Sequence, residues 1–376
     1  MKNNTKKVFI IGSTGKNNFG DDAICFSLIN ILRNRFRSKL LLYVYTKNEY
    51  FKRNFEEKQN AHVRFVSTFT QIFKAFIKSE FIIIGGGDYV GDFGPFLHII
   101  RTFGLFLSLA ILSKMLFKKF IMVNQGFHVS TRFGMAFTRL IITLCYCTSV
   151  RDSSSFLLVS KYTCKKSLRG FDTAILLETD YQPRNGKSCQ TVKNVGFSIT
   201  PSFYLDHQKK ELLAGAIARD INKILDNIEK INIYFLAFNT DPKEGDLSLI
   251  NLIRQKLNIN MQARIGLILY KHTIAHFLSQ FQKLDAIICC KYHSIIFSYL
   301  FKKPMIVIGY HPKNIALIID IDLPKRAFLS LEDILSGKLY EMLLELVKNP
   351  KQYEAKLPLY IAKRMAFSGV LNCIKL

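Results

Sequence analysis

The sequence predicts an α/β protein of two domains, each a parallel β-sheet flanked by helices. Short runs rich in Ile, Val and Phe alternate with longer stretches of helical periodicity, which is typical of parallel sheets joined by crossover helices. The 376 residues exceed the ~100–200 residues of one ordinary domain. A polar segment at 180–188, which contains Pro183 and Gly186, separates two similar series of strands and helices.

The apolar runs have the length of strands, and the segments between them have helical spacing. In the first series the predicted strands are 7–11, 40–45, 63–66, 81–84, 120–124 and 148–151, and the predicted helices are 22–36 and 97–117. In the second series the predicted strands are 194–199, 231–238, 264–269, 286–289 and 305–308, and the predicted helices are 209–229 and 293–301. We therefore expect one domain at residues 1–182 and another at 183–376.

Two Rossmann-like lobes joined in this way are expected to face each other across a cleft. Ligands of open α/β sheets bind beside the carboxyl ends of the strands. Residues that follow strands are therefore the first candidates for a functional site.

The chain is strongly basic, with 53 Lys and Arg against 28 Asp and Glu and a formal charge of +25. Its 49% hydrophobic residues exclude a disordered or fibrous protein. The charge implies a phosphorylated small molecule, an anionic membrane surface or a nucleic acid as partner, or else reflects a biased overall composition. Because the basic residues lack the aromatic interleaving and the zinc-finger spacing of nucleic-acid modules, we expect no nucleic-acid partner.

Cysteine usage and apolar runs bear on where the protein works. The eight cysteines form no Cys-x-x-Cys pair, so reduced thiols and a cytoplasmic location are expected. The apolar run at 8–11 is too short for an export signal. The most apolar stretch, 103–112, falls short of the ~20 residues of a spanning helix. We interpret it as a buried helix and leave open that it and Lys114, Lys118 and Lys119 contact an anionic membrane surface.

A glycine-rich segment, 12–22, connects the first strand to the first helix. Its small residues let backbone amides approach a ligand, and the following helix offers its positive end to an anion. The glycine spacing fits neither the dinucleotide-binding fingerprint nor a Walker loop. Our candidates here are Asn18, Gly20 and Asp21, although a loop in which an aspartate caps the helix explains part of the segment.

Three consecutive glycines and an aspartate follow the predicted strand at 81–84. A tight turn needs one glycine, so we expect a functional loop in which Gly86 and Gly87 adopt unusual backbone angles beside the cleft. Asp88 is placed to bind a hydroxyl or a neighbouring cation.

Arg151 stands at the end of the strand at 148–151. The residues that follow it are ordinary for a helix start, but they leave the arginine unexplained. An arginine at the carboxyl end of an inner strand presents a bidentate fork suited to a carboxylate or a phosphate.

Lysines and histidines gather after two consecutive strands of the second series, at 291–293 and 310–313. An isolated histidine is more often structural, but His293 is flanked by Lys291 and followed by a second basic turn that contains Lys313. We therefore expect His293 to do acid–base chemistry.

Metal and hydrolase chemistry are not supported. His272 and His276 stand four residues apart, but the glutamate of a zinc protease and a third ligand are missing, so we expect no metal. The serines at 153–155 lack the glycines of a nucleophile elbow.

The segments above occur in a fixed order: 18–21, 85–88, 124–126, 150–152 with Ser154, 291–293, and Tyr310 with Lys313. In this order and spacing they resemble the polysaccharide pyruvyl transferase family over nearly the whole chain. The fold of that family, two Rossmann-like domains arranged as in the GT-B glycosyltransferases, agrees with the lobes expected from the pattern.

The resemblance implies transfer of a carboxyethylidene group from phosphoenolpyruvate to two hydroxyls of a sugar, which yields a cyclic ketal and phosphate. The acceptor would be a surface polysaccharide or exopolysaccharide of the cell envelope, or its lipid-linked precursor, and no cofactor is required. The second domain would bind phosphoenolpyruvate, with Arg151 contributed by the first. The first domain would bind the acceptor.

The resemblance also implies roles for residues. Phosphoenolpyruvate carries a phosphate and a carboxylate, which would be bound by Arg151, Lys291 and Lys313, and His293 would protonate the enol carbon. Acceptor contacts would come from Asn18, Gly20, Asp21, Gly86, Gly87 and Asp88. The family commonly has Arg-x-His where this chain has Lys291 before His293, so a point charge replaces a planar fork.

Two other functions stay open. A GT-B glycosyltransferase would use the same lobes and cations to bind a nucleotide-sugar. A non-catalytic, membrane-associated component of polysaccharide assembly would keep the fold without the chemistry. A cytoplasmic protein is expected in each case, with peripheral attachment at the inner face of the cell membrane left open.

Overall fold

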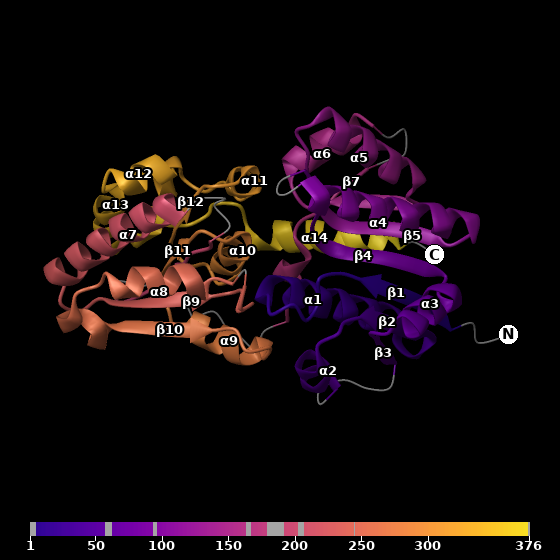
Figure 1. The fold of residues 1–376 in the computed structure, drawn as a ribbon, viewed down its shortest axis with the longest axis horizontal. Coiled ribbons are helices and arrows are strands. Elements are labelled where there is room, and N and C mark those ends of the chain that lie inside the picture. Colours follow the sequence, from indigo (N-terminus) through magenta and orange to yellow (C-terminus); the bar gives the residue numbers. More distant parts are fainter. Residues whose placement is uncertain are drawn as a thin grey trace. The chain divides into compact units, whose positions relative to one another are not determined.

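A computed structural model describes residues 5–56, 62–92, 96–162, 167–178, 192–201, 207–243 and 245–374 of the chain (Figure 1). The chain forms two compact units. Unit 1 comprises Met1–Lys16, Gly20–Glu178 and Tyr360–Leu376, and unit 2 comprises Asn17–Phe19 and Thr179–Leu359. Each unit is a parallel sheet with helices, so the predicted α/β class is confirmed.

Unit 1 contains a seven-stranded sheet in the order β3-β2-β1-β4-β5-β6-β7, and every strand pair in it is parallel. The central strands are buried on both faces, which is why they read as continuous apolar runs in the sequence. The strands are β1 Lys6–Ile11, β2 Leu40–Tyr45, β3 Val63–Val66, β4 Phe81–Gly91, β5 Lys119–His128, β6 Cys147–Val150 and β7 Leu168–Arg169.

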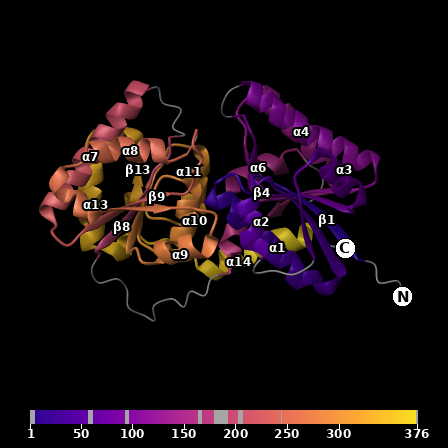
Figure 2. The same ribbon diagram turned by 60° about the horizontal axis from the view of Figure 1, so that its bottom comes forward.

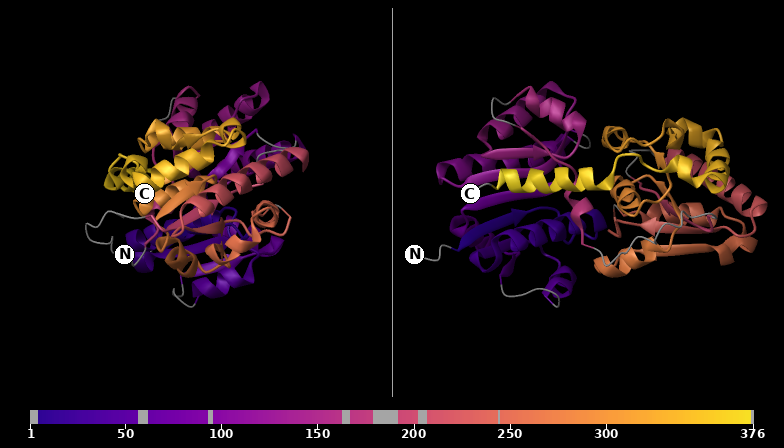
Figure 3. Two further views of the ribbon diagram at one scale, coloured as in Figure 1. Left: turned by 90° about the vertical axis from the view of Figure 1, so that its left-hand side faces the viewer. Right: turned by 180° about the vertical axis from the view of Figure 1, so that it is seen from behind.

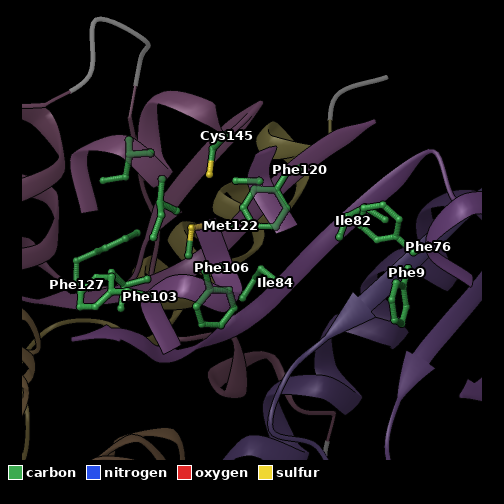
Figure 4. Packing of buried hydrophobic residues seen from close by; sticks show 14 of the residues in the cluster. Phe9, Phe76, Ile82, Ile84, Phe103, Phe106, Phe120, Met122, Phe127 and Cys145 are labelled. Atoms are coloured by element: carbon green, nitrogen blue, oxygen red, sulfur yellow. The ribbon is translucent and has the colours of Figure 1, made fainter. Parts of the chain in front are cut away.

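Helices cover both faces of this sheet (Figure 2). One apolar cluster joins α3, α4 and α5 to the sheet and includes Phe76, Phe103 and Ile141. Figure 4 shows Phe76 beside Phe9 of β1 and Phe103 near Phe127 of β5. A second cluster lies on the other face and includes Leu28 of α1 and Val370 of α14. The helices are α1 Phe19–Phe36, α2 Glu49–Glu56, α3 Phe69–Lys78, α4 Phe96–Met115, α5 Arg132–Leu144, α6 Ser153–Ser160 and α14 Leu359–Cys373, with 3-10 turns η1 Arg37–Lys39 and η2 Thr173–Leu176.

Unit 2 contains a six-stranded parallel sheet in the order β10-β9-β8-β11-β12-β13. Its strands are β8 Asn194–Ser198, β9 Asn232–Ala237, β10 Ile265–Leu269, β11 Ala286–Cys289, β12 Met305–Ile308 and β13 Phe328–Leu329. Its helices are α7 His207–Asn227, α8 Leu247–Gln255, α9 Ile274–Gln282, α10 Tyr292–Leu300, α11 Pro312–Asp320, α12 Leu331–Leu335 and α13 Lys338–Lys348, with 3-10 turns η3 Ile259–Arg264, η4 Lys325–Ala327 and η5 Pro350–Tyr353.

The structure differs from the predicted division of the chain at the C-terminus. The predicted linker at 180–188 and the boundary at 182/183 lie outside the described residues. Residues 360–376 were expected in the second domain, but they belong to unit 1, where α14 runs along the sheet (Figure 3). Val370 and Cys373 are buried in the core of unit 1, and Asn124 Nδ2 donates to the Ala366 carbonyl over 3.0 Å.

The glycine segment after the predicted strand at 81–84 is a second correction. It is not a loop, because β4 continues through it to Gly91 and pairs with β5 along its whole length. The register shifts between Gly87 and Val90, which marks a bulge in the pair. Extension of β4 and β5 carries Asp88 and His128 to the same end of neighbouring strands.

Within the described part of the chain, no helix combines the length and the apolar character that crossing a membrane requires.

Candidate functional site

The segment after β1 is held in place by buried polar contacts within unit 1. Gly15, at φ 77°, donates its N–H to Asp22 Oδ1 over 2.6 Å, and Asp22 is fully buried. Asn48 Nδ2 donates to the Gly15 carbonyl over 2.9 Å. Asp22 therefore holds the loop that precedes α1, which accounts for this aspartate without a ligand.

The three residues Asn17–Phe19 belong to unit 2, although they precede α1 in the sequence. Phe19 donates its N–H to the Phe238 carbonyl over 2.9 Å, and Asn18 forms an antiparallel bridge with Asn239. The Phe19 ring is fully buried and packs against Phe238 at a centroid distance of 5.7 Å. The sequence placed the candidate Asn18 in the first domain, whereas it lies in unit 2.

Gly20 and Asp21 continue α1 in unit 1, where Gly20 is buried and Asp21 is half-buried. The six acceptor candidates are therefore divided between the units, with Asn18 in unit 2 and the other five in unit 1.

Gly86 and Gly87 require glycine for backbone reasons. Their φ angles are 65° and 111°, in the region that side chains rarely adopt. A Cβ on Gly86 would lie 2.6 Å from Cγ2 of Ile24, so α1 packs directly on the backbone of β4. Asp88 follows these glycines where the register of the β4–β5 pair shifts, near the end of β4.

Asp88, His128 and Arg151 form a buried polar cluster with two further aspartates in unit 1. Arg151 is only 2% exposed. Its Nη1 lies 3.2 Å from Asp172 Oδ2, its Nη2 lies 3.7 Å from Asp88 Oδ2, and its Nε lies 3.8 Å from Asp152 Oδ2. The side chain of Asp88 is 19% exposed, whereas those of Asp152 and Asp172 are inaccessible. Asp88 is therefore the carboxylate of the cluster that solvent reaches.

His128 was missed from the sequence. Its Nδ1 lies 2.9 Å from Asp88 Oδ1, and its Nε2 lies 3.7 Å from Asp152 Oδ2. It ends β5 at the position that pairs with Gly91 of β4, so only the true length of the two strands brings it to Asp88. The sequence carried little signal for it, because the apolar run of β5 ends at Val123 and polar residues and a glycine follow before this histidine.

Asp152 and Asp172 also have local roles. Asp152 caps α6 by accepting the Ser155 N–H over 2.8 Å, as the sequence predicted for this helix start. Asp172 caps η2 by accepting the Ala174 N–H over 2.9 Å. Both carboxylates are thus fixed by backbone contacts, and they fix Arg151 in turn.

In unit 2 the basic candidates follow the adjacent strands β11 and β12. Lys291 is the N-cap residue of α10, His293 is half-buried in its first turn, and Lys313 is in the first turn of α11. Asn314 Nδ2 donates to the Cys290 carbonyl over 2.7 Å, which ties the start of α11 to the end of β11. The structure therefore brings Lys291, His293 and Lys313 to one edge of the sheet of unit 2.

Lys291 has a buried partner that the sequence did not reveal. Its Nζ lies 2.7 Å from Oδ1 of Asp246, which is fully buried before α8. Burial raises the pKa of Asp246, and the charge of Lys291 and a hydrogen bond from the Asn239 N–H act against that rise. The lysine side chain stays partly exposed, at 16%.

The helix starts of α10 and α11 add positive charge and hydrogen-bond donors to the edge that carries the lysines. Each helix begins there, so backbone N–H groups and the positive ends of both helices lie beside the lysines. His311 Nδ1 accepts the Lys313 N–H over 3.3 Å and so takes the place of a hydroxyl or carboxylate cap. Such an edge can bind an anion and deliver a proton from an imidazole.

Comparison with solved structures shows the fold. The S. aureus MnaA–UDP co-structure has a TM-score of 0.60 and 15% identity, over 99% of this chain and 98% of that chain. A putative UDP-N-acetylglucosamine 2-epimerase from Listeria monocytogenes has a TM-score of 0.61 and 11% identity, over 99% and 96%. The UDP-GlcNAc 2-epimerase from Methanocaldococcus jannaschii has a TM-score of 0.60 and 13% identity, over 98% and 99%. The predicted pair of Rossmann-like, GT-B-like units is confirmed.

Comparison with protein families is more specific. No protein of curated function matches the chain in sequence. The sequence profile described as polysaccharide pyruvyl transferase matches residues 18–312. That range includes Asp88, Arg151, Lys291 and His293, and it ends one residue before Lys313. Because the match covers most of the chain and both polar clusters, the protein belongs to the polysaccharide pyruvyl transferase family.

Proposed function

We propose that the protein transfers a carboxyethylidene group from phosphoenolpyruvate to two hydroxyls of one sugar, with release of phosphate. The acceptor is a surface polysaccharide or exopolysaccharide, or its lipid-linked precursor, and the reaction takes place in the cytoplasm at the inner face of the cell membrane. Family membership supports the reaction class. The observation that carries the assignment is the edge of unit 2 where Lys291, His293 and Lys313 lie at two helix starts.

The chemistry needs anion binding and one well-placed acid. Lys291 and Lys313 bind the phosphate and carboxylate of phosphoenolpyruvate, helped by the N–H groups of the two helix starts. His293 donates a proton to the methylene carbon, which becomes a methyl group and leaves positive charge on the adjacent carbon. One sugar hydroxyl attacks that carbon, phosphate leaves with its bonding electrons, and the second hydroxyl closes the ketal. One of the two hydroxyl protons returns to His293, and the other leaves with phosphate.

The acceptor side of the proposal rests on the carboxylate cluster of unit 1. Asp88 accepts a hydrogen bond from a sugar hydroxyl, and the contact with His128 orients its carboxylate. Gly20, Asp21, Gly86 and Gly87 of unit 1 and Asn18 of unit 2 are the further proposed acceptor contacts.

Arg151 has two possible actions in this scheme, and kinetics separates them. Its guanidinium already lies 3.2–3.8 Å from three carboxylates. An anion that bound Arg151 would therefore be repelled by these carboxylates at close range. If Arg151 binds phosphoenolpyruvate, as the sequence indicates, Arg151→Lys raises the KM for phosphoenolpyruvate. If Arg151 only holds Asp88, the same variant lowers kcat or raises the KM for the acceptor.

The first test is acceptor-dependent phosphate release from phosphoenolpyruvate. His293→Gln is expected to lower the rate by about 10²–10⁴, the usual contribution of a positioned acid. His276→Gln is the matched control, because His276 is exposed on α9 of the same unit. A His293→Gln variant that folds and keeps the rate of the parent protein would remove His293 from the mechanism.

A nucleotide-sugar transferase is the second candidate, because the similar S. aureus structure is a complex with UDP. Thermal unfolding in the presence of phosphoenolpyruvate, UDP-sugars and GDP-sugars distinguishes the two, since a bound ligand raises the melting temperature. Stabilisation by nucleotide-sugars alone would overturn pyruvyl transfer. A non-catalytic assembly component, the third function considered, predicts normal glycan modification in cells that carry only His293→Gln.

A further inference from the structure

The outer surface of α3, α4 and α5 in unit 1 exposes more large apolar side chains than folding explains. These helices cover one face of the sheet, and their inner residues fill the core there. We call their outward surface, together with the turn after α4, the apolar face. Its exposed members are Phe69, Phe73, Ile77, Leu97, Ile100, Leu105, Ile111, Leu112, Met115, Leu116, Phe117, Phe133 and Leu140.

The ends of α3 and α4 are held together, so their apolar residues form one surface. Lys118, just after α4, donates from Nζ to the carbonyls of Ile77 and Ser79 at the end of α3, each over 2.7 Å. Phe73 and Ile77 stand at i and i+4 on α3 and therefore share a side of that helix. Phe117 directly precedes Lys118 in the turn after α4.

Phe117 closes α4 in a left-handed backbone conformation with its ring in solvent. Its φ is 54°, and it closes α4 at the position where glycine is preferred, since the Lys118 N–H bonds back to the Ser113 carbonyl over 2.8 Å. A bulky residue at positive φ is strained. The ring is 97% exposed, so no packing within the protein offsets that strain. The cap of α4 fixes this backbone, and it holds the ring out in solvent, where it is available to an apolar partner.

The charge of the apolar face has one sign. Each of α3, α4 and α5 carries two Lys or Arg residues and no Asp or Glu. All of these cations are exposed: Lys74, Lys78, Arg101, Lys114, Arg132 and Arg139. An apolar surface edged with cations complements the headgroups and upper acyl chains of an anionic bilayer. Two copies of this chain meeting through the same face would oppose cation to cation.

We propose that the apolar face of unit 1 binds the surface of an anionic phospholipid bilayer, with Phe117 and its neighbours inserted among the lipids. Attachment is peripheral, and its free energy combines two weak contributions: insertion of apolar side chains and attraction of the cations to anionic headgroups. The inference goes beyond pyruvyl transfer and does not depend on it, because none of the residues involved belongs to the proposed catalytic clusters.

Co-sedimentation with vesicles tests the proposal on the full chain. The parent protein is expected to bind vesicles that contain phosphatidylglycerol, to bind pure phosphatidylcholine far more weakly, and to be released by salt. The variant Phe73→Ser/Met115→Ser/Phe117→Gly is expected to lose about tenfold or more in vesicle affinity. Lys74→Gln and Lys114→Gln are each expected to weaken binding roughly fivefold.

The matched control is Ile259→Ser/Ile319→Ser, which removes two exposed apolar side chains of unit 2 and is expected to leave binding unchanged. Phe117→Gly alone is expected to keep or raise the melting temperature while weakening binding, because glycine relieves the strain at φ 54°. Phosphate release with a water-soluble acceptor is expected to be unchanged in every variant, so a failure of pyruvyl transfer leaves the vesicle result interpretable.

Three results would overturn the proposal. The first is a parent protein that does not bind anionic vesicles, and the second is a triple variant that binds them as tightly as the parent. The third is a parent dimer that the triple variant converts to a monomer without a change in vesicle binding, which would assign the face to a second copy of the chain.

Discussion

Replacing Arg151 by methionine removes a buried cation from among three carboxylates and keeps most of the side-chain volume. The three contacts span 3.2–3.8 Å. At an effective dielectric constant of about 20, each unit-charge attraction at this distance is on the order of 4–5 kcal/mol before desolvation is subtracted. Breaking a buried ion pair from one side typically costs about 3–5 kcal/mol, and we expect that loss for unit 1.

Thermal and urea unfolding measure this loss. For a unit of this size, about 3–5 kcal/mol corresponds to a decrease of roughly 10 °C in melting temperature. Arg326→Met is the control in unit 2, because its guanidinium lies 3.0 Å from Glu345 and both side chains are exposed, at 51% and 44%. Such exposed pairs contribute about 0–1 kcal/mol. Restoring charge balance with Arg151→Met/Asp172→Asn is expected to recover part of the stability. A loss for Arg151→Met no larger than that for Arg326→Met would refute the buried cluster as described.

Three further changes test other parts of the structure. Lys291→Met leaves the buried Asp246 without its cation, so the pKa of Asp246 in the folded protein rises further. A carboxyl whose pKa is raised by folding makes the protein less stable as the pH increases above 3.8, the ordinary pKa of aspartate, so the melting temperature of the variant should fall more steeply with increasing pH than that of the parent. Adding Asp246→Asn should abolish this extra pH dependence. Gly86→Ala should destabilise unit 1 by about 2 kcal/mol or more, because φ is 65° and the new Cβ would clash with Ile24. Gly215→Ala in α7, which has open space around it, should stabilise the protein by about 0.5–1 kcal/mol, and urea unfolding of both variants measures the difference. His128→Leu should lower kcat for the acceptor-dependent reaction, whereas His128→Asn can still hydrogen-bond Asp88 and should keep a higher kcat than His128→Leu. Equal kcat values for the two variants would show that His128 does not position Asp88.

Most of the fold could be predicted from the sequence because the strands are buried on both faces. Such strands must be continuously apolar, so β1, β2, β8 and β11 were identified almost to the residue. The two-residue strands β7 and β13 carry no pattern of that kind and were missed. The end of β4 was missed because glycines indicate a loop unless a neighbouring strand, here β5, is known to pair with them.

Local order along the chain was sufficient to select candidate site residues, since parallel strands place the residues that follow them at one edge of a sheet. It selected Arg151, Lys291 and His293 without revealing their partners. Asp172 reaches Arg151 from 21 residues away, and Asp246 reaches Lys291 from 45 residues earlier in the chain. Only the packed fold decides such pairings. The attraction between two charges depends on their distance in space and on how much water the surrounding core excludes, and the order of residues specifies neither quantity directly.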